Sequence, residues 1–131
     1  MTDDQFMASF EDCSLPADIF DHRAHVRMAF LYLCRYSLLE TIQRFSAALA
    51  KFAAAQGKVA RYHETITWAF LFLICERMQR AGRTPSWEEF SADNADLLSW
   101  EQNILRKYYR EETLASDLAR ATFLLPDKLC P

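Results

Sequence analysis

Apolar residues recur every three or four positions along most of the chain, and polar residues fill the intervening positions. This spacing is typical of amphipathic α-helices that bury one face. No stretch alternates strictly between apolar and polar residues over a strand's length, so the pattern favours helices throughout. We expect helices over residues 2–11, 22–36, 38–56, 61–81, 87–91 and 100–110, and a last helix from Thr113 or Ser116 to about 124.

Residues that begin and end helices stand where this pattern changes. Helix N-caps are expected at Thr2, Asp21 and Ser99, and the S-x-x-E spacing of a capping box occurs at Ser37–Glu40 and Ser86–Glu89. Gly57 and Gly82 follow the two longest helices, where a residue with positive φ commonly ends a helix. The chain holds only these 2 glycines in 131 residues, against about 7% on average, which disfavours hairpin-rich β folds and glycine-rich phosphate loops.

The helix over 61–81 is the expected centre of the fold. Its segment 68–75 is apolar on all sides, which predicts burial on most of its surface. A chain of 131 residues fits one domain with its own core. The sequence therefore predicts an all-α, compact, single-domain bundle of five to seven helices around 61–81. Residues 1–20 form an acidic N-terminal segment of this domain, and residues 126–131 an extended tail.

Charge is divided unevenly along the chain. Residues 1–21 carry six acidic side chains and no lysine or arginine, whereas residues 22–61 carry seven basic side chains and one acid, Glu40. One interpretation is that the acidic segment lies across the basic helices of its own chain. The alternative is a basic surface for anions or nucleic acid. The sequence disfavours nucleic acid as a partner, because the acidic segment is nearby and no nucleic-acid motif is present.

Several features predict a cytoplasmic protein without a membrane partner. The chain begins Met1-Thr2-Asp3-Asp4, which lacks the positive charge of a signal peptide. Its longest apolar run, 68–75, is too short to cross a bilayer. The four cysteines form no C-x-x-C pair and suggest neither a zinc ribbon nor a disulfide framework.

The three histidines are the main candidates for chemistry. His22 and His25 are three residues apart and share a helix face with Ala29 and Tyr32, and His63 lies on a stripe of the central helix with Thr67 and Phe70. All three therefore point to where a core or a pocket is expected. Three neutral imidazoles suit a divalent transition metal with an open position. A single imidazole suits general acid–base catalysis, and the structural alternative is a set of hydrogen-bonded core residues.

Polar residues beside His63 extend this candidate site. Glu64 is expected to be partly buried, with Arg27 or Arg61 as its cationic partner. Candidate catalytic residues are thus His22, His25, His63 and Glu64, the candidate metal ligands are the three histidines, and the candidate ligand-binding residues are Arg27, Tyr32, Tyr62 and Thr67. Arg120 is either a helix-surface residue or a fork for a carboxylate or phosphate.

Part of the chain resembles a group of short bacterial proteins. The residues that carry the resemblance are Phe20-Asp21-His22-Arg23-Ala24-His25-Val26-Arg27-Met28-Ala29 and Tyr62-His63-Glu64-Thr65-Ile66-Thr67. The group consists of helical proteins of uncharacterised function, so the resemblance supplies no reaction. It implies that His22, His25, Arg27, His63, Glu64 and Thr67 belong to one pattern.

Two functions follow from the sequence as expectations. The first is a small-molecule or metal-binding protein, including an enzyme that uses imidazole or metal-assisted chemistry, with a site built from helix side chains. The second is a non-enzymatic interaction or regulatory module, including a homodimer, in which the histidines are structural. Exposed aromatic area around Trp87 and Trp100 would favour the second.

Overall fold

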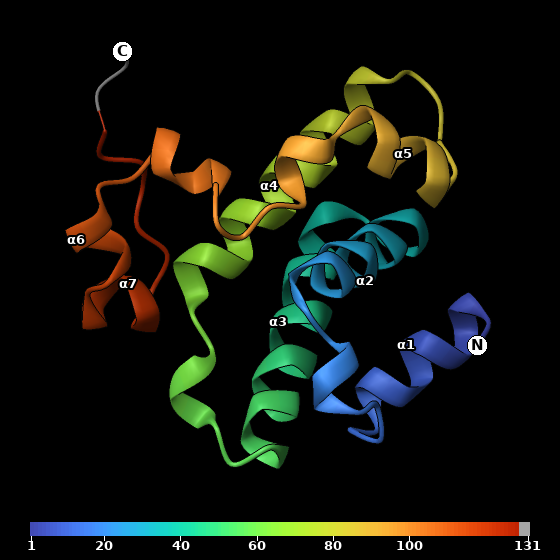
Figure 1. Ribbon diagram of the computed structural model, residues 1–131, viewed down its shortest axis with the longest axis horizontal. Helices are drawn as coiled ribbons and strands as arrows, with labels where there is room; N and C mark the ends of the chain where they lie inside the picture. The colour runs from blue at the N-terminus through green and yellow to red at the C-terminus, as the bar shows by residue number, and fades with distance from the viewer. Residues whose placement is uncertain (129–131) are drawn as a thin grey trace.

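The fold is all-α and places its longest helices side by side (Figure 1). The computed structural model describes residues 1–128, and this part of the chain holds seven α-helices and no strand. The all-α fold class that the sequence predicts is therefore confirmed. The helices are α1 (Asp3–Glu11), α2 (His22–Arg35), α3 (Leu38–Ala55), α4 (Glu64–Arg80), α5 (Trp87–Asp93), α6 (Glu111–Leu114) and α7 (Asp117–Ala121). Short 3-10 helices connect them: η1 (Ala17–Ile19), η2 (Val59–Arg61), η3 (Ala95–Leu97) and η4 (Ile104–Lys107).

Helix α4 is the centre of the bundle, as its apolar sequence predicts. It contacts α2, α3, α7 and η4, and Figure 1 shows it running between α2 and α3 on one side and α6 and α7 on the other. Leu71 and Ile74 of α4 are completely buried among these neighbours. No helix within residues 1–128 combines the length and the apolar character needed to cross a membrane.

The capping residues lie where the sequence places them. The side chains of Thr2, Asp21, Ser37, Ser86 and Ser116 each accept a hydrogen bond from a backbone N–H of the first helical turn. Gly57 and Gly82 adopt φ angles of 70° and 71° after α3 and α4, a conformation that favours glycine.

The predicted reciprocal capping box at Ser37 is not formed. The Glu40 carboxylate accepts a hydrogen bond from Arg44 Nε one turn further along α3, at 3.0 Å. An i,i+4 ion pair on the exposed helix surface thus replaces the expected bond back to Ser37.

Helix α4 begins three residues later than expected, which corrects the range 61–81. His63 has an extended backbone, with φ −136° and ψ 108°, and its ring accepts a hydrogen bond from Ile66 N. His63 is therefore the N-cap of α4 and not a residue of its helical face. The three residues before Tyr62 form η2 instead.

The helix predicted over 100–110 is absent, and the short 3-10 helix η4 stands in its place. Asn103 is buried, and its side chain accepts a hydrogen bond from Leu105 N. Ser99 likewise accepts from Gln102 N. Such bonds compete with the hydrogen-bonding pattern of an α-helix, which explains the interruption.

The last predicted helix is divided into α6 and α7 and ends at Ala121, three residues early. Thr122 is extended, and its carbonyl accepts a hydrogen bond from Thr65 on α4 at 2.8 Å. Residues 126–128 have no regular structure, as predicted for the tail, and the remainder of that prediction lies outside the described residues.

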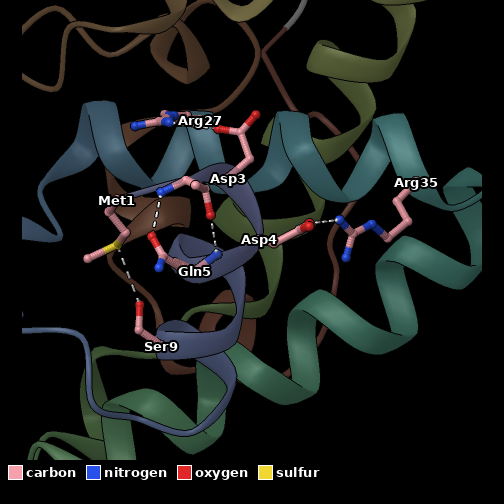
Figure 2. Close-up of polar contacts among 8 residues, drawn as sticks. Met1, Asp3, Asp4, Gln5, Ser9, Arg27 and Arg35 are labelled. Carbon is pink, nitrogen blue, oxygen red and sulfur yellow. Dashed lines mark hydrogen bonds and ion pairs between the residues drawn. The ribbon is translucent and has the colours of Figure 1, made fainter.

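The acidic N-terminal segment lies across the basic helices, as the first interpretation of the charge pattern predicts. Asp3 pairs with Arg27 at 2.8 Å, and Asp4 pairs with Arg35 (Figure 2). Lys51 of α3 donates to the carbonyl oxygen of Glu11 at the end of α1. Phe10 of α1 is fully buried and contacts the aromatic rings Phe20, Tyr32, Phe45 and Phe52.

Candidate functional site

A cavity of about 1110 Å³ lies between α2, α3 and α4. Residues of η2, the segment after η3, and helices α6 and α7 complete its walls. Most of the lining is apolar, and the largest of these side chains are Phe20, Phe45, Phe52, Phe70, Leu71 and Trp100. The cavity lies beside the connection between α3 and α4, in which Gly57 follows α3 and five further residues, 58–62, precede the extended His63.

The cavity brings together five of the eight residues that the sequence predicts for a site. These are His22, His25, His63, Tyr62 and Thr67. The other three, Arg27, Tyr32 and Glu64, are not part of its lining. The histidine pattern thus locates the cavity, although the individual histidines have separate environments.

His63 uses both ring nitrogens in the fold. Nδ1 accepts a hydrogen bond from Ile66 N at 3.1 Å, and Nε2 lies 2.7 Å from the carbonyl oxygen of Leu114. Because Nδ1 accepts, the proton is on Nε2, which donates to Leu114. Burial lowers the pKa of His63, and the positive charge of Arg120 acts in the same direction. His63 is therefore a neutral cap that joins the start of α4 to α6.

His22 stands at the first position of α2 and lines the cavity. Its Nε2 lies 2.9 Å from the carbonyl oxygen of Leu97. Its ring packs between Phe70 and Trp100, with centroid separations of 5.1 and 5.2 Å. Burial lowers the pKa of His22, while the Leu97 carbonyl acts against this shift.

His25 has the most perturbed pKa of the three histidines. Burial lowers its pKa to about 4, and repulsion from His22 contributes in the same direction. Its ring stacks on Phe20 at a centroid distance of 4.0 Å. At neutral pH His25 is consequently an uncharged ring on the cavity wall and a weak base.

The predicted three-histidine metal site is not formed. Within residues 1–128 no group of three or more histidine, cysteine, aspartate or glutamate side chains has the arrangement to hold a metal ion. The physical reason is that His63 has both nitrogens engaged with the backbone, and His22 has one. A metal ligand needs a free ring nitrogen, so these bonds compete directly with coordination.

Glu64 has a different partner from the one expected. Its carboxylate accepts a hydrogen bond from the Tyr62 hydroxyl rather than pairing with Arg27 or Arg61. Burial, followed by this bond, raises the pKa of Tyr62 to about 12. The Tyr62 side chain is thus uncharged and lines the cavity. Glu64 is hydrogen-bonded to it but does not line the cavity itself.

Arg27 and Tyr32 hold α1 instead of lining the cavity. Arg27 pairs with Asp3 and lies over the Phe6 ring at 4.8 Å from the ring centroid. The Tyr32 hydroxyl donates to Glu11 at 2.6 Å, and burial followed by this bond raises the pKa of Tyr32. Both side chains therefore contact residues of α1 and lie outside the cavity lining.

Sequence reasoning missed other side chains of the cavity. Trp100, 53% exposed, lies against the His22 ring, and Lys58 and Arg61 line the part of the cavity at η2. Arg120 joins this part, because its Nη1 donates to the carbonyl oxygen of Ala60 at 2.6 Å. The basic residues around Gly57 are visible in the sequence as part of the uneven charge pattern. That pattern alone does not show where these residues lie in the fold.

Fold and site together define an all-α domain with one large, mainly apolar cavity that carries neutral histidines. Comparison with protein-family models, curated proteins and solved structures finds no match to this chain. Function must therefore be argued from the residues of the cavity.

Proposed function

We propose that the protein binds a small, mainly apolar molecule in the cavity between α2, α3 and α4. The observation that supports this is the size and lining of the cavity, about 1110 Å³ with mostly apolar walls. Known ligand pockets span roughly 300–1,000 Å³ and combine apolar walls with a few polar groups. Here the polar groups include His22, His25, Tyr62 and Thr67.

Binding fits these side chains better than imidazole catalysis does. The pKa of His25, about 4, makes this ring a poor proton acceptor at neutral pH. His63 has both nitrogens occupied by the backbone. The imidazoles are better suited to contact a ligand as flat, uncharged surfaces.

The alternative of an interaction module has less support. Trp87 packs on Phe30 and Phe90, with centroid distances of 5.5 and 6.2 Å, and so belongs to the core edge around α5. Trp100 rests on His22 at the cavity. Both indole rings thus pack against other aromatic rings of this chain.

Binding can be tested with the uncharged fluorophore N-phenyl-1-naphthylamine. We expect saturable binding to the wild-type protein and binding weakened by about tenfold or more in Ala53→Leu, because Ala53 of α3 lines the cavity and leucine would fill part of it. Ala54→Leu is the matched control, since the next residue is exposed and does not line the cavity. Absence of saturable binding, or equal binding to both variants, would contradict the proposal.

A further inference from the structure

Positive charge is concentrated on one part of the cavity wall. Lys58 precedes η2, Arg61 is its last residue, and Arg120 of α7 is hydrogen-bonded to Ala60 within η2. All three side chains line the cavity. Two segments that are about sixty residues apart in sequence thus bring three cations to the same edge of an apolar space.

These three cations differ from most other arginines of the protein. Seven arginines lie within 4.0 Å of a carboxylate oxygen, each in one ion pair. Among residues 1–128, the other four arginines, Arg23, Arg61, Arg110 and Arg120, have no such partner, and Lys58 has none either. Three of these four arginines line the cavity, whereas none of the seven paired arginines does. Unpaired arginines are therefore concentrated at the cavity, although Arg110, outside its lining, also has no carboxylate partner.

The acidic residues of the cavity do not balance this charge locally. Only Asp21 and Glu101 are acidic among the described lining residues. Asp21 is occupied as the N-cap of α2, where Oδ1 accepts from Ala24 N at 2.9 Å. Glu101 adjoins Trp100, at the part of the cavity that His22 borders.

We infer that the ligand is an elongated apolar molecule with one anionic head, such as a medium-chain carboxylate. This inference rests on the proposed binding function and specifies its ligand class. The head would lie against Lys58, Arg61 and Arg120, and the chain between the rings of Phe45, Phe52 and Phe70. Arg120 uses one of its five N–H donors on Ala60, which leaves others for a carboxylate.

Competition against bound N-phenyl-1-naphthylamine distinguishes the head group from the chain. We expect dodecanoate to displace the probe at about tenfold lower concentration than dodecanol, which has the same chain and no charge. The advantage should shrink as salt is raised, because Lys58 and Arg61 are exposed and Arg120 is only half-buried. The double variant Lys58→Gln/Arg61→Gln should remove most of the advantage while leaving displacement by dodecanol unchanged.

The control is Arg80→Gln/Lys107→Gln, which removes the same charge at exposed positions outside the cavity lining and should retain the preference for dodecanoate. Equal displacement by dodecanoate and dodecanol would overturn the inference about the head group and leave the proposed function standing. A preference that is unchanged in Lys58→Gln/Arg61→Gln, or lost equally in the control, would also overturn it. If the fluorophore itself does not bind, both proposals fail.

Discussion

The imidazole of His63 connects two parts of the chain that are 51 residues apart. Its Nδ1 caps α4 through Ile66 N, while its Nε2–H donates to the carbonyl oxygen of Leu114 at 2.7 Å. No other residue type supplies an acceptor and a donor at the two ends of one rigid, uncharged ring. This geometry accounts for a buried histidine without any metal.

Replacement of His63 should separate its two roles. His63→Ala removes the cap and leaves the Leu114 carbonyl without its partner, so we expect a loss of about 2–4 kcal/mol in the free energy of unfolding. His63→Asn restores a capping side chain but does not reach Leu114, so the loss should be about 1–2 kcal/mol. Urea unfolding followed by circular dichroism measures both. Equal stability of the two variants would show that capping contributes nothing.

Acid should destabilise the fold through His25. The pKa of His25 is about 4 in the folded protein, below its ordinary value of 6.5, so the unfolded chain binds more protons between these values. The free energy of unfolding is therefore fully retained above pH 6.5 and falls as the pH drops toward 4, by roughly 2–3 kcal/mol from this group. Titration of the His25 ring signals by NMR should give the lowered pKa directly.

His25→Phe provides the control for this pH effect. It keeps an aromatic ring against Phe20 and cannot titrate, so its stability should fall less than that of the wild type between pH 6.5 and 4. His22 and His63 also have lowered pKa values and continue to contribute in the variant. If both proteins lose stability in parallel, His25 is not responsible.

Apolar burial, more than ion pairing, should hold α1 on the bundle. Phe10 has no exposed surface, and Phe10→Ala is expected to cost ~3–5 kcal/mol. Asp4→Asn removes an exposed pair with Arg35 and should cost much less, because solvent screens such pairs. Denaturation of the two variants at low and high salt tests the ranking. If Asp4→Asn lowers the free energy of unfolding more than Phe10→Ala does at low salt, ion pairing and not apolar burial holds α1 on the bundle.

Thr65 and Thr67 of α4 allow a comparison between a threonine that is hydrogen-bonded to the backbone of a distant segment and one that lines the cavity. Thr65 Oγ1 donates to Thr122 O at 2.8 Å and accepts from Leu124 N at 3.0 Å, whereas Thr67 lines the cavity. Thr65→Val leaves two backbone groups without partners and should cost about 1–3 kcal/mol. Thr67→Val should cost clearly less. Faster amide hydrogen exchange at Leu124 in Thr65→Val would locate the loss, and similar costs for both variants would contradict this role for Thr65.

Local sequence signals predict much of the architecture. The caps Thr2, Asp21 and Ser86 and the glycines Gly57 and Gly82 mark helix ends correctly, because a cap bonds within three residues and positive φ belongs to one residue. The same locality explains the failure over 100–110. There, side-chain bonds from Ser99 and Asn103 compete with a helix that the apolar spacing favours.

The site depends on contacts that no local pattern contains. His22 and His25 reach the cavity from the helix face that they share, and His63 reaches it as the N-cap of α4. The partners of His22 and His63, however, are backbone carbonyls 75 and 51 residues away. Those bonds determine which ring nitrogens remain free, and so they compete with the expected metal coordination. By itself the sequence determined most of the helices and several of their ends, and it offered the attachment of the acidic segment to the basic helices as one of two interpretations. Only the packing of α2, α3, α4 and η2 decided that a cavity exists and which cations border it, because such contacts depend on distant segments meeting in space.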